Sequence, residues 1–169
     1  MFKKFKPDYE FDSTYNIDFD AFYEEGIRGI IFDIDNTLVA HDAPCTDESD
    51  ALIFKLKDKG FKIFIISNNN EERVKIFNPN VNVDYIYKGD KPKADSYIKA
   101  LDKMGLTKEQ VIAVGDQLFT DCLGAKNYGI KFIKVGIIDK KEPPHIKLKR
   151  VLEKPIELLT KTQVLKGKQ

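Results

Sequence analysis

Two carboxylates and a hydroxyl stand at alternate positions directly after an apolar run in this sequence. The run covers residues 29–32, and Asp33, Asp35 and Thr37 follow it. Like charges this close repel each other and a strand end solvates them poorly, so we expect them only where a cation or a phosphoryl group uses their proximity. The spacing therefore favours metal-dependent phosphoryl transfer.

Further polar residues follow later apolar runs, where they could serve the same chemistry. A lysine at the start of a helix could help to neutralise a phosphate. Lys91 is favoured for this role because Pro92 fixes the local motif, and Lys93 is the alternative. The other candidates are Ser67, Asn68, Asn69, Asp116, Gln117 and Asp121.

Five apolar runs separated by helical patterns must position these residues. Continuously apolar strands that alternate with helices are typical of a parallel sheet with both faces covered and with right-handed crossovers. The predicted fold class is α/β, a doubly wound, Rossmann-like five-stranded parallel sheet. Ligands of such sheets bind beyond the carboxyl ends of the strands, so the polar candidates should converge on one edge. The predicted strands are Gly29–Phe32, Phe61–Ile66, Asp84–Tyr87, Val111–Val114 and Lys131–Val135.

Capping residues mark the ends of several helices between these strands. Thr46 is expected to cap a helix with an acidic first turn, and Gly60 ends that helix. Apolar residues at helical spacing predict another helix over residues 94–101, which Gly105 closes. A further helix is expected over Thr120–Tyr128.

The composition predicts one domain with one sizeable core. The chain has 169 residues, of which 42% are hydrophobic and 33% are charged. We expect a single domain over residues 1–169, with its core at about 27–138 and a basic segment at 139–169. The 28 basic and 27 acidic side chains leave a net charge of +1, which favours neither nucleic acid nor a strongly acidic partner.

The carboxyl-terminal part is nevertheless basic, because residues 131–169 hold 11 basic and 4 acidic side chains. A solvated amphipathic tail is one interpretation, and attraction to an anionic membrane surface is another. In a third, Ile146, Leu148, Val151 and Leu152 pack on the domain as a final helix. No uncharged run approaches the roughly 20 residues of a membrane span, so we expect a cytoplasmic protein, with peripheral membrane contact left open.

Two histidines and two cysteines are assigned no chemistry. His41 and His145 have no evident partners and are expected at the surface. Cys45 and Cys122 form no disulfide framework and no close metal-ligand pair, which suits a reducing cytosol. We expect them to be unreactive core or loop thiols.

The candidate residues resemble a known signature in both order and spacing. The signature is that of haloacid dehalogenase-like (HAD) phosphatases, and the resemblance covers about residues 27–138. Its four motifs are matched by Asp33-x-Asp35-x-Thr37, Ser67 after an apolar strand, Lys91-Pro92 and Gly115-Asp116-x4-Asp121. The stretches Ser67-Asn68-Asn69 and Glu142-Pro143-Pro144-His145 further resemble the YqeG-like, subfamily IIIA branch. That branch is related to phosphatidylglycerophosphate phosphatases.

The resemblance implies a mechanism in which two carboxylates have different roles. Asp33 would be the nucleophile and form an aspartyl-phosphate, while Asp35 would protonate the leaving alcohol and then activate water. Mg2+ would be held by the carboxylates of Asp33 and Asp116 and by the main-chain carbonyl of Asp35, since hard oxygen ligands suit this ion.

The resemblance also implies which residues bind the phosphoryl group. Thr37, Ser67 and Lys91 would bind its oxygens as charge spreads over them, with Asn68 as a further substrate-binding residue. Asp121 would orient Lys91 or a metal-bound water rather than bind the metal directly.

The spacing of the motifs leaves no room for a cap domain. Only 29 residues separate Thr37 from Ser67, and 23 separate Ser67 from Lys91, so one helix and one strand use up each interval. An open site suits a bulky or surface-bound phosphate ester such as a phospholipid headgroup. Alternatively, a partner subunit closes the site in an oligomer. The branch suggests phosphatidylglycerophosphate, but soluble sugar phosphates, nucleotides and phosphoproteins would meet the same catalytic residues.

Two other classes of protein share parts of this pattern. Receiver domains of signalling pathways also combine an α/β sheet with acidic residues, a hydroxyl, a lysine and Mg2+. Here no acid follows directly on the third predicted strand, which ends at Tyr87 and is followed by Lys88, so the pattern of a receiver domain is absent. A phosphate-binding module without turnover is the other alternative, although Asp35 and every other motif residue needed for turnover is present.

Overall fold

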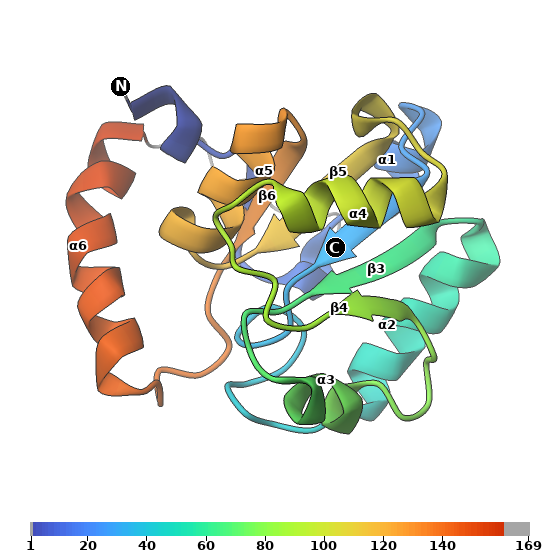
Figure 1. The fold of residues 1–169 in the computed structure, drawn as a ribbon, viewed down its shortest axis with the longest axis horizontal. Helices are drawn as coiled ribbons and strands as arrows, with labels where there is room; N and C mark the ends of the chain where they lie inside the picture. Colours follow the sequence, from blue (N-terminus) through green and yellow to red (C-terminus); the bar gives the residue numbers. More distant parts are fainter. Residues whose placement is uncertain (1, 161–169) are drawn as a thin grey trace.

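The computed structural model describes residues 2–160, which form a parallel sheet covered by helices on both faces (Figure 1). The sheet has six strands in the order β1-β6-β5-β2-β3-β4, and every neighbouring pair is parallel. The strands are β1 (Tyr9–Phe11), β2 (Gly29–Phe32), β3 (Lys62–Ile66), β4 (Asp84–Ile86), β5 (Val111–Gly115) and β6 (Lys131–Val135). The predicted α/β class is confirmed, and all five predicted strands are present within a residue or so of their expected ends.

The predicted number of strands was wrong by one, because β1 adds an edge strand beside β6. Tyr9 pairs with Ile133 and Phe11 with Val135. A strand of three residues is too short to form an apolar run, so no sequence pattern predicts it.

Helices connect the strands and lie on the two faces of the sheet. The helices are α1 (Phe19–Glu24), α2 (Asp47–Lys59), α3 (Glu71–Phe77), α4 (Asp95–Met104), α5 (Leu123–Tyr128) and α6 (Pro144–Thr160). Short 3-10 turns occupy η1 (Phe2–Phe5), η2 (Thr14–Asn16) and η3 (Lys108–Gln110), and a π-helical turn forms η4 (Leu118–Cys122). No cap domain is inserted between these elements within residues 2–160.

The capping predictions for α2 are confirmed. The Thr46 side chain accepts the main-chain N–H of Ser49, and Gly60 ends the helix with a φ of +105°. A β-carbon is strained in that left-handed region, so glycine suits the position. The helix expected from Thr120 begins earlier, as the π-helical turn η4.

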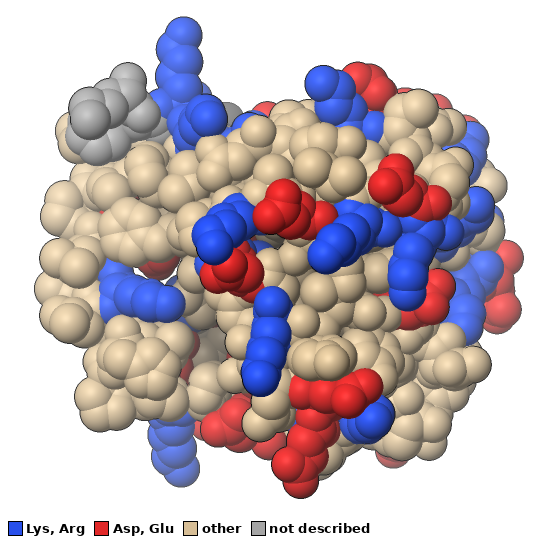
Figure 2. Space-filling view, in the orientation of Figure 1, with Lys and Arg blue, Asp and Glu red and all other residues tan. Residues whose placement is uncertain are grey.

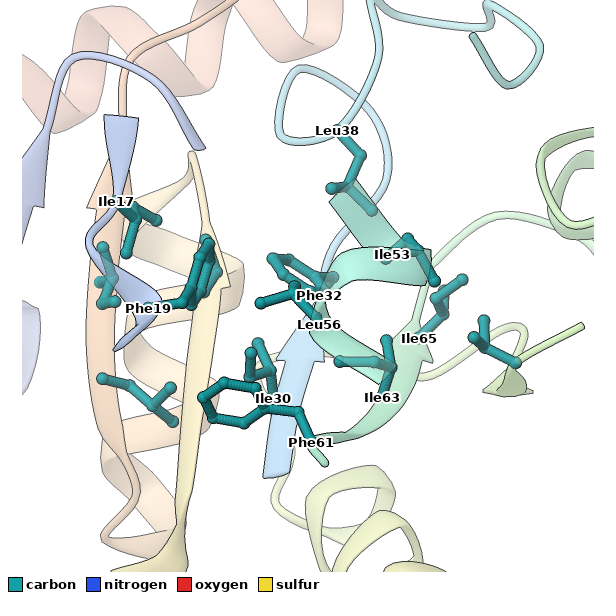
Figure 3. Packing of buried hydrophobic residues seen from close by; sticks show 14 of the residues in the cluster. Ile17, Phe19, Ile30, Phe32, Leu38, Ile53, Leu56, Phe61, Ile63 and Ile65 are labelled. Carbon is teal, nitrogen blue, oxygen red and sulfur yellow. The ribbon is translucent and has the colours of Figure 1, made fainter. Parts of the chain in front are cut away.

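Alternate strand residues face two separate apolar cores. In β2, Ile30 and Phe32 point to the core beneath α2, where Figure 3 shows them beside Leu56. The intervening Ile31 belongs to the second core, which includes Tyr97 of α4. Strands that are buried on both sides read as continuous apolar runs, which is why their positions could be predicted.

The last helix, α6, contacts η1 and η4 at the edge of the molecule (Figure 1). Most of its apolar residues face outward: Leu152 is 56% exposed and Leu158 is 74% exposed, whereas Glu153 is buried and Ile156 packs against the second core. The segment therefore forms a final helix, but Leu148, Val151 and Leu152 do not pack on the domain. The outer apolar face of α6 consists of Leu148, Val151, Leu152, Leu158 and Leu159.

Within residues 2–160, no helix is both long enough and apolar enough to cross a membrane. The remainder of the basic segment expected at 139–169, from residue 161 onward, lies outside the described residues.

Candidate active site

A cavity of about 410 Å³ opens at the carboxyl ends of the central strands. The motif residues that line it are Asp33, Asp35, Ser67, Asn68, Lys91 and Asp121. Pro143 and the first turns of α6 add to the lining, with His145, Ile146 and Lys149 from the helix. A larger hollow, of about 840 Å³, lies between α1 and α2 and contains none of the motif residues.

Asp33 and Lys91 form the closest charge pair of the motif residues. The N–H of Asp33 donates to the carbonyl of Val114 at 3.0 Å, which fixes the start of the loop against β5. The ammonium of Lys91 lies 2.6 Å from Asp33 Oδ1 and 2.7 Å from Asp121 Oδ1. It also donates to the carbonyl of Ile66 at 2.9 Å. One buried cation thus joins two carboxylates that come from different strand ends.

Burial and charge act in opposite directions on the pKa values of this pair. Burial raises the pKa of Asp33 well above its ordinary value, and the ammonium of Lys91 opposes that rise. Burial lowers the pKa of Lys91, but the carboxylates of Asp121 and Asp33 more than offset this, so its pKa is raised. Lys91 therefore carries its positive charge at neutral pH.

The main chain of Lys91 is clamped by Asn68. The N–H of Lys91 donates to Asn68 Oδ1 at 2.8 Å, and Asn68 Nδ2 donates back to the carbonyl of Lys91 at 3.1 Å. Lys93 is exposed and its ammonium pairs with Asp90. The geometry thus directs Lys91 into the site and Lys93 away from it.

Asp121 approaches β5 closely because residue 115 is a glycine. A β-carbon on Gly115 would lie 2.6 Å from the β-carbon of Asp121, which real structures do not tolerate. Asp121 Oδ2 accepts the N–H of Gln117 at 3.1 Å. Its other oxygen pairs with the ammonium of Lys91.

Three acidic side chains form a group that fits a divalent cation. Asp33, Asp116 and Asp121 each offer a carboxylate oxygen within 4.8 Å of the others. Oxygen donors at this separation suit hard cations such as Mg2+. Burial raises the pKa of Asp116 to about 6, against the opposing charge of Arg150.

Thr37 and Ser67 take up positions near these carboxylates. The Thr37 hydroxyl lies 3.5 Å from Asp116 Oδ1, and the Thr37 carbonyl accepts the hydroxyl of Thr14 at 2.6 Å. Ser67 lines the cavity, and its hydroxyl accepts the N–H of Asn69 at 3.1 Å. Both hydroxyls are held within the loops that end β2 and β3.

The carboxylate of Asp35 is held from several sides. Arg73 donates to Oδ1 from Nε at 3.2 Å and from its terminal nitrogen at 2.8 Å. The N–H of Asp42 donates to the same oxygen at 2.8 Å, and Asn69 donates to Oδ2 at 2.7 Å. Neither the role of Arg73 nor that of Asn69 was predicted, since a lone arginine at a helix start carries no motif.

His145 is exposed, as expected, but His41 is only half-exposed and does have charged partners. Both side chains line the cavity. His41 Nδ1 lies 4.0 Å from Asp35 Oδ1, and its Nε2 lies 3.4 Å from a carboxylate oxygen of Asp42. Folding of the loop after Thr37 brings His41 back toward the strand ends, which spacing alone does not reveal.

Arg150 of α6 reaches into the site, and nothing in the sequence pattern indicated it. Its guanidinium pairs with the carboxylate of Asp116 and donates to the Asp116 carbonyl at 3.0 Å. It forms a second, two-pronged contact with Glu142, at 2.7 and 3.3 Å. Glu142 in turn accepts Asn36 Nδ2 at 2.8 Å. The basic segment therefore supplies a wall of the site.

The thiols behave as expected. Cys122 is buried and Cys45 is half-buried, and both are free. Burial raises the pKa of Cys122 to about 12 and raises that of Cys45 as well, so neither is a reactive thiolate at neutral pH.

A family of known proteins matches this chain in sequence. The profile of haloacid dehalogenase-like hydrolases matches residues 39–129. The chain is also 39% identical over 137 residues to the probable phosphatase YqeG of Bacillus subtilis (strain 168), and the match covers 80% of each chain.

Solved structures share the fold at lower identity. An uncharacterized protein of Listeria monocytogenes serotype 4b has a TM-score of 0.54 at 20% identity, over 80% of this chain and 99% of its own. The cobalt-bound deoxy-D-mannose-octulosonate 8-phosphate phosphatase of Haemophilus influenzae has a TM-score of 0.51 at 14% identity, over 80% of this chain and 90% of its own. At these identities the likeness concerns the fold.

Proposed function

Because the chain belongs to the haloacid dehalogenase-like hydrolase family and is a phosphatase of that family, we propose that it hydrolyses phosphate monoesters with Mg2+ through an aspartyl-phosphate at Asp33. The observation that carries this proposal is the 2.6 Å contact between the Asp33 carboxylate and the buried ammonium of Lys91. A fixed positive charge at this point offsets the repulsion between a carboxylate nucleophile and an anionic phosphate.

The carboxylates of Asp33 and Asp116 and the main-chain carbonyl of Asp35 are the proposed ligands of Mg2+. The grouping of Asp33, Asp116 and Asp121 supports a cation at this place, and Asp121 keeps its role of orienting Lys91. When bound, the ion would supply positive charge that neutralises the phosphate and the nucleophile together.

In the proposed reaction, Asp33 attacks phosphorus and the bond between phosphorus and the ester oxygen breaks. The electron pair of that bond goes to the leaving oxygen, which takes a proton from Asp35. Water then attacks the aspartyl-phosphate, gives its proton to Asp35 and releases Asp33 and inorganic phosphate. Thr37, Ser67 and Lys91 hold the phosphoryl oxygens while this happens.

Asn68 has a less direct part in this proposal than the sequence suggested. Both polar atoms of its side chain bond the main chain of Lys91. It lines the cavity, and it serves the substrate chiefly by fixing the lysine that binds the phosphoryl group.

The proposed substrate is a phospholipid headgroup, namely that of phosphatidylglycerophosphate. The resemblance to the YqeG-like branch supports it, and so does the lack of a cap over the cavity within the described residues. The outer apolar face of α6 lies on the helix whose first turn borders the cavity, and Lys147 and Lys154 are exposed on that helix. In Figure 2 the edge that α6 forms is mostly tan, with isolated basic side chains.

Such a face would place the protein at the surface of an anionic membrane from the cytoplasmic side, with the mouth of the site toward the lipid. A soluble phosphate ester is the alternative substrate, because the catalytic residues would act on it equally.

Phosphate release with Mg2+ tests the proposal. The panel holds phosphatidylglycerophosphate in mixed micelles, glycerol phosphate, sugar phosphates, nucleotides, a phosphopeptide and an aryl phosphate, with Asp33→Asn as the control. A strong preference for the micellar lipid is the expected result. Activity on soluble esters alone would overturn the lipid substrate but keep the phosphatase, and no release from any ester would favour a binding module without turnover.

A further inference from the structure

We propose that Arg73, with Asn69, is a positioning residue that fixes the carboxylate of Asp35 for proton transfer to the leaving group. This inference rests on the proposed function, because it assigns a task within the same reaction. Arg73 lies outside the four motifs and does not line the cavity, so it acts through the carboxylates that it contacts, Asp35 at 2.8 Å and, more distantly, Asp42 at 3.9 Å.

The two oxygens of Asp35 have different surroundings. Oδ1 accepts three N–H groups: two come from the guanidinium of Arg73 and one from the main chain of Asp42. Oδ2 accepts only the neutral amide of Asn69, at 2.7 Å. The charged contacts are therefore gathered on Oδ1, where they fix the plane of the carboxylate, while Oδ2 is left to the neutral amide.

Asn69 and Arg73 hold Asp35 from different sides. Asn69 lines the cavity beside Asp35, whereas Arg73 is not among the residues that line it. The contact with Asn69 thus holds Oδ2 at the wall of the cavity, where the leaving oxygen of a bound ester would be within its reach.

The guanidinium of Arg73 is buried at a cost in free energy. Its side chain is 8% exposed, and its second terminal nitrogen has no hydrogen-bond partner among residues 2–160. A buried unpaired donor costs free energy, so the pairing with Asp35 must hold the guanidinium in place. Asn70 caps α3 by accepting the N–H of Arg73 at 2.9 Å, which fixes the main chain from which the side chain reaches Asp35.

The dependence of rate on the leaving group tests this role. An aryl phosphate releases a stable phenolate without a proton, whereas glycerol phosphate releases an alkoxide that needs one. We therefore compare kcat/KM for 4-nitrophenyl phosphate and glycerol 3-phosphate in the full chain and in Arg73→Gln. This ratio reports steps up to the transfer of phosphate to Asp33, so it is insensitive to the later activation of water.

For Arg73→Gln we expect kcat/KM to fall about a hundredfold for glycerol 3-phosphate and by less than about threefold for the aryl ester. Arg73→Lys should recover part of the loss, and Asn69→Ala should show the same selectivity. Asp35→Asn should show the strongest selectivity. Lys75→Gln is the matched control, because Lys75 lies on the same helix in an exposed pair with Glu71 and should change neither value.

An equal loss with both esters would overturn the inference, since a structural role of Arg73 would act on both. A crystal structure of Arg73→Gln gives a second test that does not depend on activity: the Asp35 carboxylate should leave its contact with Asn69. If the Asp35 carboxylate keeps its position in Arg73→Gln, the inference is overturned. This structural test holds even if the unchanged protein hydrolyses neither ester, and that inactivity would contradict the proposed function instead.

Discussion

Arg150 of α6 pairs with Asp116 at the end of β5, so the last helix is tied to a proposed ligand of the metal. The same guanidinium is held by Glu142 and lies 3.8 Å from a carboxylate oxygen of Glu153. Removal of one partner from a buried cluster of this kind leaves the other charges uncompensated. The cluster therefore links the stability of α6 to the charge of Asp116 in the site.

Arg150→Ala should lower the free energy of unfolding by about 3 kcal/mol, because three acidic side chains lose their shared cation. Urea denaturation measures the change. Arg150→Lys should recover part of it, and Lys147→Ala, an exposed change on the same helix, should stay within about 0.5 kcal/mol. Equal stability of Arg150→Ala and the unchanged protein would show that the cluster does not hold α6.

Asp33→Asn should reduce turnover by about a thousandfold or more, since the amide is a poor nucleophile. The melting temperature should change by only a few degrees, because Lys91 keeps Asp121 as its partner. A phosphate-release assay and a thermal melt check both statements. Retained turnover with Mg2+ would exclude Asp33 as the nucleophile.

Asp116→Asn should raise the Mg2+ concentration needed for half-maximal activity by at least about tenfold and reduce the maximal rate. Titration calorimetry with Mg2+ alone gives the affinity without reference to activity. Removal of metal with EDTA should abolish turnover in the unchanged protein. A Mg2+ affinity that is the same in Asp116→Asn would exclude this carboxylate as a ligand.

Stability should fall as pH rises from about 4.5 to about 7 through the contribution of Glu153. Burial raises the pKa of Glu153 from its ordinary 4.5 to about 7, against the N–H of Phe119 and the charge of Arg150. An acid with a raised folded pKa binds more protons in the folded state than in the unfolded state, so raising pH favours unfolding in this window. The slope from this group is at most about 1.4 kcal/mol per pH unit.

Glu153→Gln should remove that slope, and urea denaturation between pH 4 and pH 8 measures it. The difference in unfolding free energy between the variant and the unchanged protein should grow across the window. If the two proteins show parallel pH profiles, the pKa of Glu153 is the same in the folded and unfolded states, and the prediction is wrong.

Leu152→Ser and Leu158→Ser should leave the free energy of unfolding within about 0.5 kcal/mol, because both side chains are exposed. Each should weaken sedimentation with anionic phospholipid vesicles by about tenfold, the amount expected for one leucine side chain removed from lipid. Phe54→Ser is the control, because Phe54 is 45% exposed on α2, away from this face. Unchanged vesicle binding would exclude the outer apolar face of α6 as a membrane contact.

The sequence predicted the parts of the molecule that depend on local patterns. Buried strands such as β2 appear as apolar runs, and Thr46 and Gly60 mark helix ends through interactions with near neighbours. Asp33 and Asp116 could be expected to lie close together because parallel strands end at one edge of a sheet. Their chemical roles are still predictions.

The contacts that could not be predicted join residues far apart in the chain without a repeated pattern. Arg150 looks like one of several basic residues in a solvated run, and only the tertiary fold shows which one turns inward. Arg73 likewise lies beside Glu71 and Glu72, which the sequence presents as an ordinary acidic helix start. The outward direction of Leu152 was also hidden, because a helical period does not state which face the rest of the protein covers.

The two carboxylates of the first motif are anchored to the molecule in different ways. Asp33 donates its N–H to Val114 between central strands, so we expect this amide to exchange with solvent as slowly as the ladder of the sheet. Asp35 lies on a loop that side chains from outside the sheet hold, since Thr14 donates to the Thr37 carbonyl and Arg73 to the Asp35 carboxylate. The proposed nucleophile thus depends on the sheet alone, and the place of the proposed proton donor depends on the segments packed around the loop.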